Sequence, residues 1–169
     1  MASLTLPSFA TLKPKYPTSS DPDKVKKEIG GEAVESWITN TCVIRMSEAF
    51  NYCGEARCKI PKSHALLTIA GGDKLRYAIR VQEFVDFLRD NYGPPDVIRT
   101  GDKISKRPFL DKTGIIAWRV NGWTDATGHF TLWDGKKGLY VGDHDYFAMP
   151  LKKPDGGGAW LTKAELWKC

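Results

Sequence analysis

Cysteine and histidine side chains are the residues of this chain best suited to nucleophilic chemistry, and Cys42 comes first among them. It lies at the predicted start of a helix, directly after Asn40 and Thr41. There, the free backbone N–H groups and the positive end of the helix dipole favour the thiolate, which is the nucleophilic form. Cys42 also lies on an apolar stripe, and cysteine is among the most buried residue types, so a purely structural role stays open.

A thiol nucleophile needs a base, and His129 has the most suitable setting among the three histidines. It opens the predicted strand GHFTLW directly after Gly128, and a glycine there allows another backbone or a substrate to approach closely. His64 lies in PKSHALL without an acidic neighbour, which indicates a structural residue. We therefore pair Cys42 with His129, because cysteine amidases place a histidine at a strand start opposite the N-terminus of a packed helix.

A third side chain should orient the imidazole of His129, and three aspartates are candidates. Asp143 follows the next predicted strand, so a neighbouring strand could bring it beside the histidine. Asp134 lies in a turn, where aspartate is common for local reasons, and Asp145 is the remaining alternative. We prefer Asp143. His144 lies between two aspartates, but no matching cluster exists elsewhere in the sequence, so we expect neither a metal nor a cofactor.

Cys53 and Cys58 are separated by the four residues GEAR. This spacing could close a small disulfide loop in an oxidising compartment, or the two thiols could remain reduced. A zinc site is a weak alternative because the sequence has no second CxxC or CxxH pair to complete it.

Apolar periodicity predicts two helices that could position Cys42. The first covers 42–53, with Asn40 or Thr41 as N-cap and Gly54 beyond its end. The second covers about 80–92 and ends at Gly93-Pro94. Residues 24–38 predict two shorter helical pieces separated by Gly30-Gly31.

The second half of the chain predicts an antiparallel sheet that carries His129. β-branched and aromatic runs alternate with the hairpin dipeptides Asn121-Gly122 and Asp134-Gly135. The predicted strands are 114–120, 129–133, 138–141 and 164–168. N-terminal helices packed on an antiparallel sheet give an α+β fold.

Length and composition favour one globular domain. The 169 residues fit a single catalytic domain covering 1–169, and 41% of them are hydrophobic. Residues 1–23 contain four prolines and predict an extended N-terminal arm on the surface.

The charge balance points to an anionic partner but not to nucleic acid. The net charge is 25 − 20 = +5, which favours polyanions such as acidic cell-wall polymers. The basic residues are scattered, which argues against nucleic-acid binding, and no apolar run is long enough for membrane insertion. The N-terminal residues lack the features of a signal peptide, so we expect a cytosolic protein or one that is exported without a cleavable signal.

Two motifs together resemble a known enzyme family. The segments NTCVIRMSEAFN (40–51) and ATGHFTLWDG (126–135) are similar to the cysteine and histidine motifs of the type VI secretion amidase effectors of the fourth family. Further likeness covers nearly the whole chain in the right order: PSFATL (7–12), Tyr16-Pro17, Val25, Ile29-Gly30-Gly31 and 114–123.

The resemblance implies a papain-like, NlpC-type cysteine peptidase fold and a peptidoglycan amidase toxin. Members cleave the bond between γ-D-glutamate and meso-diaminopimelate in peptidoglycan stem peptides within the periplasm of competing bacteria, and a cognate immunity protein protects the producer. Carried over to this chain, Cys42 is the nucleophile, His129 the base and then the acid, and Asp143 the third residue. Relatives often flank that aspartate with cysteines, whereas Val141 and Asp145 stand here, so a disulfide that fixes the loop is not expected.

Two other functions remain compatible with the sequence. A housekeeping or phage-type cell-wall cysteine peptidase of the same fold would cut another stem-peptide bond. A basic binding module without enzymatic activity would use Cys42 and His129 only as core residues.

Overall fold

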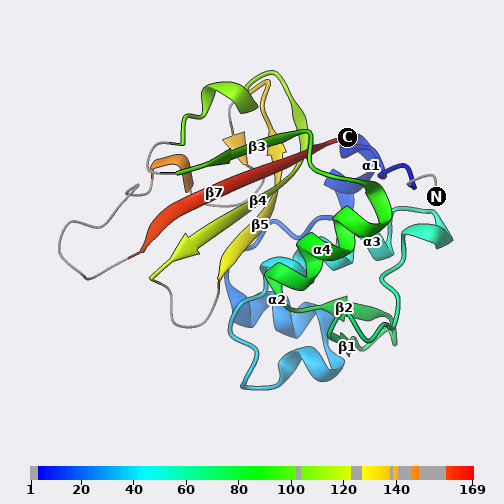
Figure 1. Cartoon of the computed structure of the whole chain (residues 1–169). Helices are drawn as coiled ribbons and strands as arrows, with labels where there is room; N and C mark the ends of the chain where they lie inside the picture. The colour runs from blue at the N-terminus through cyan, green and yellow to red at the C-terminus, as the bar shows by residue number, and fades with distance from the viewer. Residues whose placement is uncertain (1–3, 102–103, 123–126, 138, 141–145, 149–158) are drawn as a thin grey trace.

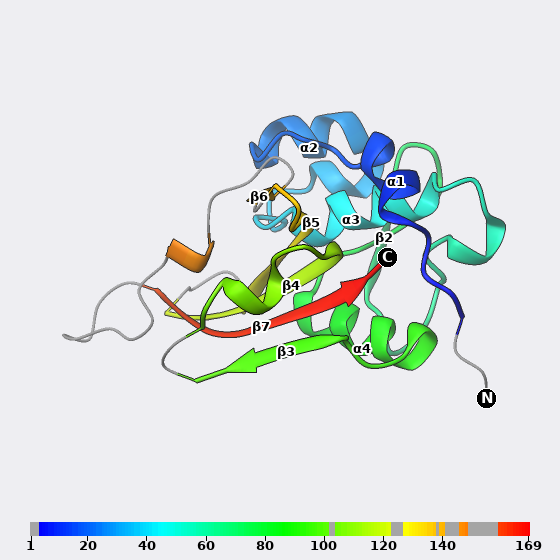
Figure 2. The same cartoon turned by 90° about the horizontal axis from the view of Figure 1, so that it is seen from above.

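A computed structural model describes residues 4–101, 104–122, 127–137, 139–140, 146–148 and 159–169. Helices from the first half of the chain lie beside an antiparallel sheet formed by the second half (Figures 1 and 2). The α-helices are α1 (Phe9–Leu12), α2 (Pro22–Ile29), α3 (Cys42–Asn51) and α4 (Val81–Tyr92). The described 3-10 helices are Lys13–Lys15, Gly31–Val34, Ala56–Cys58, Arg107–Phe109 and Tyr146–Ala148.

The strands form a main sheet and a small hairpin. The main sheet consists of β3 (Val97–Thr100), β4 (Thr113–Asn121), β5 (Gly128–Asp134), β6 (Leu139–Tyr140) and β7 (Trp160–Lys168). These described strands follow the order β3-β7-β4-β5-β6, and each neighbouring pair is antiparallel. The hairpin pairs β1 (Thr68–Ala70) with β2 (Arg76–Ala78). The predicted α+β class, with N-terminal helices on an antiparallel sheet, is confirmed.

The two long helices follow the sequence closely. α3 begins at Cys42 as predicted, and α4 ends where Gly93 adopts a φ of 91°. That positive φ favours glycine, which explains why the helix stops there. The two helical pieces predicted within 24–38 are confirmed as α2 and the 3-10 helix Gly31–Val34.

The prediction of an extended N-terminal arm is wrong for residues 9–15, which are helical. The Ser8 hydroxyl accepts a hydrogen bond from the backbone N–H of Thr11 and starts α1, and the 3-10 helix Lys13–Lys15 follows. Leu12 and Tyr16 are buried and anchor this segment in the core, while residues 13–15 between them are exposed. The prolines misled the prediction because proline is also tolerated in the first turn of a helix.

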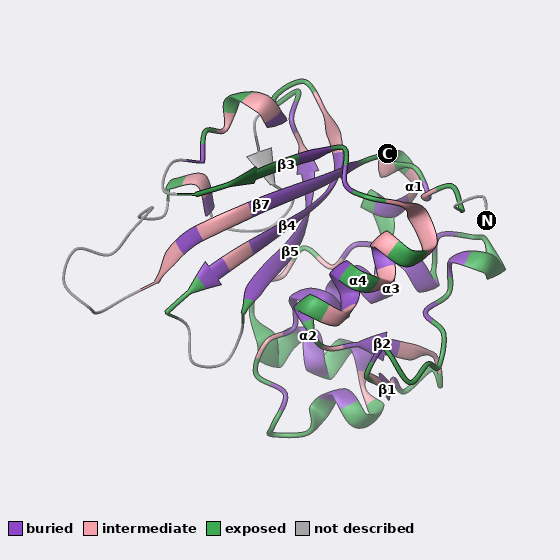
Figure 3. Ribbon diagram, viewed as in Figure 1, coloured by how far each residue is buried: buried purple, intermediate pink, exposed green. Residues whose placement is uncertain are grey.

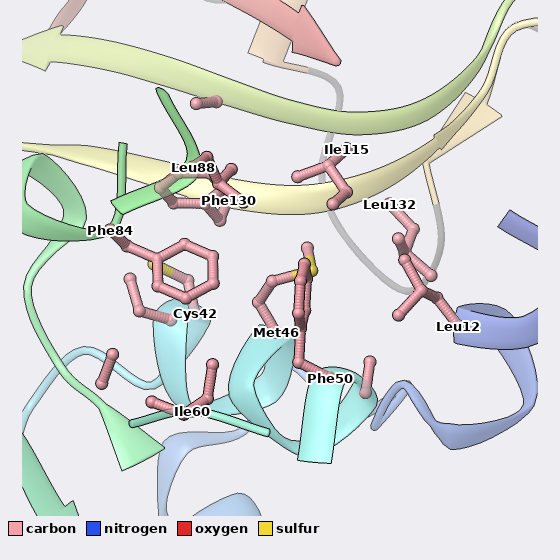
Figure 4. Packing of buried hydrophobic residues seen from close by; sticks show 14 of the residues in the cluster. Leu12, Cys42, Met46, Phe50, Ile60, Phe84, Leu88, Ile115, Phe130 and Leu132 are labelled. Atoms are coloured by element: carbon pink, nitrogen blue, oxygen red, sulfur yellow. The ribbon is translucent and has the colours of Figure 1, made fainter. Parts of the chain in front are cut away.

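One face of the main sheet supports α3 and α4 through a continuous apolar cluster (Figures 3 and 4). Phe84 of α4 contacts Phe50 of α3 and Phe130 of β5 in edge-to-face geometry, with ring centroids 5.8 Å and 5.2 Å apart. Such aromatic pairs add to the free energy of burial and fix the helices relative to the strand. The cluster therefore holds the start of α3 against β5.

Candidate active site

The structure places Cys42 as the first residue of α3. Its side chain is 3% exposed. Its backbone N–H donates a 3.0 Å hydrogen bond to Oδ1 of Asn40, while Thr41 at the N-cap makes no side-chain cap bond. Asn40 therefore ties down the first free N–H group of the helix, which is the role that helix-capping side chains have.

Cys42 points into the space between α3, α4 and β5. Figure 4 shows it at the top of α3, next to Phe84 and below Phe130. Cys53 and Cys58 are also buried in this cluster, so burial alone does not distinguish Cys42. What sets Cys42 apart is its position at the helix start.

His129 is the second residue of β5, and its side chain is 7% exposed. It lies opposite Trp118 of β4. Its ring stacks on the ring of Tyr146, with centroids 4.5 Å apart and an interplanar angle of 15°. A buried, stacked imidazole has few accessible rotamers, so its ring plane is held in one orientation.

The glycine before His129 is required by close packing. A Cβ atom built on Gly128 would lie 2.0 Å from the carbonyl oxygen of Trp118 and 3.2 Å from Cγ1 of Val81. The predicted close approach at this glycine is thus confirmed, and the neighbours are β4 and the first residue of α4. The start of β5 is fixed between them.

One cavity of about 440 Å³ is lined by residues from the segments that precede the two predicted catalytic residues. Asn40, two residues before Cys42, lines it from one side, and Thr127, two residues before His129, lines it from another. Residues 79–83 at the start of α4 complete the described lining. The segments that lead into α3 and β5 therefore border the same space, while Cys42 and His129 themselves are not among its lining residues.

A second link joins α3 to the face of β5 that carries His129. Alternation along the strand places Thr131 on the same face as His129, and Phe130 on the other face. The Tyr16 hydroxyl donates to Oγ1 of Thr131 at 3.4 Å, and the guanidinium of Arg45, one turn after Cys42, lies 4.7 Å from the centre of the Tyr16 ring. Through Arg45 and Tyr16, α3 is thus linked to the face of β5 that carries His129, in addition to its apolar packing against the other face.

Sequence reasoning did not find Arg45 or Tyr16 as neighbours of the site. Arg45 is buried, and its Nε donates to the carbonyl oxygen of Pro17 at 2.9 Å. A buried charge in the middle of an apolar helix stripe was the available signal, because such groups almost always have specific partners.

The structure does not describe the preferred candidate for the third catalytic residue. Asp143 and Asp145 both lie outside the residues that the structure describes. Asp134 is the last residue of β5, five positions after His129, which corresponds to about 17 Å along an antiparallel strand. Asp134 is therefore too far along the strand to contact the His129 imidazole. His64 is exposed, which is compatible with a residue that takes no part in the site.

The two cysteines whose spacing could close a small disulfide loop are reduced. Cys53 and Cys58 are free thiols in the structure. Burial, with a smaller contribution from a hydrogen bond to Cys53, raises the pKa of Cys58 to about 12. A thiol with that pKa stays protonated near neutral pH, so Cys58 is not a nucleophile there.

The described residues offer neither a metal site nor a membrane-spanning helix. They contain no group of three His, Cys, Asp or Glu side chains arranged to hold a metal ion. Among the described helices, none has the length and apolar character that crossing a bilayer requires.

Known proteins share this sequence pattern and fold. Residues 38–160 match the model of a family described as type VI secretion system (T6SS), amidase effector protein 4, or Tae4. The chain belongs to this family. None of the curated protein sequences compared with it gives a significant match.

Solved structures of Tae4 proteins are similar over nearly the whole chain. Tae4 from Enterobacter cloacae is 30% identical, with a TM-score of 0.81 over 99% of each chain. The match to the Tae4–Tai4 effector–immunity complex from Enterobacter cloacae has 31% identity and a TM-score of 0.79 over 97% of this chain and 99% of that one. Tae4 from Salmonella typhimurium, in complex with the immunity protein Tai4 from Enterobacter cloacae, has 28% identity and a TM-score of 0.79 over 96% and 99%.

Membership of the Tae4 family settles the coarse function. The chain is a type VI secretion amidase effector, and the family supports an antibacterial peptidoglycan amidase. The predicted papain-like, NlpC-type fold is confirmed by the likeness to the Tae4 structures. The alternative of a binding module without enzymatic activity is not supported by this family.

Proposed function

We propose that the chain hydrolyses the amide between γ-D-glutamate and meso-diaminopimelate in peptidoglycan stem peptides, with Cys42 as the nucleophile and His129 as its base. The observation that carries the proposal is the cavity bordered by residues just before Cys42 and just before His129. Both side chains come from rigid elements that the apolar cluster holds together. We propose that a substrate bound at that cavity brings its amide within reach of both side chains.

In the proposed mechanism His129 takes the proton of the Cys42 thiol, and the thiolate attacks the γ-glutamyl carbonyl carbon. His129 then gives the proton to the leaving amine of diaminopimelate as the C–N bond breaks. Water, deprotonated by His129, attacks the thioester and releases the glutamyl acid and the free thiol. Asp143 is proposed to hold the imidazole in the required orientation, as the family resemblance implies.

The oxyanion of the tetrahedral intermediate needs hydrogen-bond donors, and the backbone N–H of Cys42, at the helix start, is the candidate. In the structure this N–H donates to Oδ1 of Asn40. We propose that Oδ1 of Asn40 releases the Cys42 N–H when substrate binds, so that the oxyanion can accept this hydrogen bond instead. The bond to Asn40 keeps the donor in position until then.

Delivery and partners follow from the family. Tae4 proteins from Enterobacter cloacae and Salmonella typhimurium form complexes with Tai4 immunity proteins. A corresponding immunity protein is proposed to protect the producer of this chain, while the injected effector acts in the periplasm of the target cell. The net charge of +5 suits the anionic cell wall that it would meet there.

Digestion of purified sacculi, with chromatography and mass spectrometry of the fragments, tests the proposal. The wild-type chain should release fragments with new D-glutamate carboxyl ends and new diaminopimelate amino ends. Cys42→Ala should release none, whereas Cys53→Ala, a control from the other end of α3, should cleave like the wild type. Fragments cut at another bond would favour a cell-wall peptidase of different specificity, and cleavage by Cys42→Ala would disprove the thiol mechanism.

A further inference from the structure

The cavity beside the candidate site carries a basic side chain that the proposed chemistry does not use. Arg80 immediately precedes α4, and its side chain is 63% exposed. It is the one basic residue in the described lining of the cavity of about 440 Å³. It could therefore contact a bound substrate directly.

Most of the hydrogen-bonding capacity of Arg80 is available. Its Nη1 donates to Oε1 of Glu83 at 3.0 Å. A guanidinium has five N–H donors, and within the described residues no other N–H of this group meets a protein acceptor. The planar fork that remains matches the geometry of a carboxylate.

The acidic residue of the cavity is already engaged. Oε2 of Glu83 accepts the backbone N–H of Leu67 at 2.6 Å, and Oε1 accepts from Arg80. Glu83 therefore anchors the guanidinium at the cavity wall while its own charge is partly compensated. A single exposed ion pair of this kind is weak, so the fork can also bind an anion.

The packing of α4 places Arg80 near the residues that precede His129 and Cys42. Val81, the next residue, lies against Gly128, which directly precedes His129. Asn40, which holds the backbone of Cys42, lines the same cavity. An anion bound by Arg80 would thus lie next to the bond under attack.

We propose that Arg80 binds a free carboxylate of the stem peptide beside the scissile amide and makes the enzyme selective for stems that carry this charge. The inference rests on the proposed function. A γ-linked D-glutamate keeps its α-carboxylate, and meso-diaminopimelate keeps a carboxylate outside the peptide chain. Either group can supply the charge, and converting it to a carboxamide removes the charge with little change in shape.

Three synthetic stem peptides separate the two sources. One has both carboxylates free, one has the D-glutamate α-carboxylate amidated, and one has the diaminopimelate carboxylate amidated. The wild type should lose about tenfold in kcat/KM on one amidated peptide, as expected for one charge-assisted hydrogen bond. The peptide that suffers the loss identifies the carboxylate.

Matched variants test whether Arg80 is responsible. Arg80→Gln should cleave the free and amidated peptides at similar rates, with a raised KM for the free peptide, and Arg80→Lys should keep part of the preference. Arg99→Gln, an exposed position on β3, should discriminate like the wild type. If the Arg80→Gln variant preferred the free carboxylate as strongly as the wild type does, the assignment would be overturned. A wild-type chain that cleaves no stem peptide would overturn the proposed function, and the role of Arg80 with it.

Discussion

Cysteines lie at the start of helix α3 and just beyond its end, and both are buried but differently placed. At its start Cys42 follows Asn40, which lines the cavity, and packs in the apolar cluster with Phe130, the residue after His129. Beyond its end, Cys53 lies beside Cys58, whose pKa is raised to about 12 mainly by burial. The comparison teaches that burial alone does not distinguish Cys42, the proposed nucleophile, from the other buried cysteines. Its position at the helix start does.

The same contrast extends along the helix. Near its end, Glu48 lies 2.6 Å from the hydroxyl of Tyr77, and that hydroxyl lies 2.7 Å from Oδ2 of Asp73. Tyr52 donates to the same carboxylate oxygen at 2.6 Å. These contacts tie α3 to β2 and its preceding turn, so we assign the end of α3 to stability and its start to chemistry.

The largest effect is expected at the start of the helix. His129→Ala should lower kcat by about 10²- to 10⁴-fold, because the general base and acid is lost. His64→Ala, an exposed control, should leave the rate unchanged. Rates on a soluble stem peptide measure both, and equal rates for His129→Ala and the wild type would contradict the pairing with Cys42.

Gly128→Ala should damage fold and activity together. The added Cβ would meet the Trp118 carbonyl oxygen at 2.0 Å, so β5 must move away from β4. Overpacking of this kind costs about 1–3 kcal/mol, and the shift would also displace His129. Urea unfolding and peptide hydrolysis measure the two effects, and an unchanged midpoint would show that the strand start is not tightly fixed.

Tyr77→Phe tests the end of α3 alone. The variant removes a buried hydroxyl that contacts two carboxylates, and the expected loss in free energy of unfolding is about 1–3 kcal/mol. The catalytic rate should stay at the wild-type level. A strong loss of activity with unchanged stability would reverse the division of roles along the helix.

The smallest effect concerns pH. Burial raises the pKa of Glu48 above its ordinary value of 4.5, although the hydrogen bond with Tyr77 acts in the opposite direction. A carboxyl group whose folded pKa is raised contributes stability below its unfolded pKa, and this contribution is lost as pH rises through the folded pKa. Wild-type stability should therefore fall relative to Glu48→Gln as pH rises above about 4.5. Denaturation curves of both proteins at several pH values measure this, and parallel pH profiles would argue against a raised pKa.

The sequence predicted the parts of the molecule that rest on local patterns. The apolar period and the glycine beyond α4 predicted both long helices, and the alternating runs predicted β4 and β5. β3 was missed because its four residues are mostly exposed and carry no alternation. β7 begins four residues earlier than predicted, at Trp160, because only Leu161 among these four residues is buried and the apolar pattern there is weak.

The positions of the two proposed reacting residues were predictable, but the contacts around them were not. The sequence placed Cys42 at a helix start and His129 after a closely packed glycine, and the structure has both there. The bond from the Cys42 N–H to Asn40 and the stacking of Tyr146 on His129 depend on side-chain packing and on contacts between distant residues. Local sequence patterns carry no direct signal for such contacts.

Thiol labelling tests the central claim most directly, because it compares the cysteines within one molecule. The folded chain is treated with iodoacetamide at neutral pH, and the modified sites are identified by mass spectrometry of its peptides. Cys42 should be modified first, and the labelling should slow in His129→Ala, while Cys58 stays unmodified. An inert Cys42, or Cys53 and Cys58 reacting as fast as Cys42, would contradict the assignment of Cys42 as the activated nucleophile.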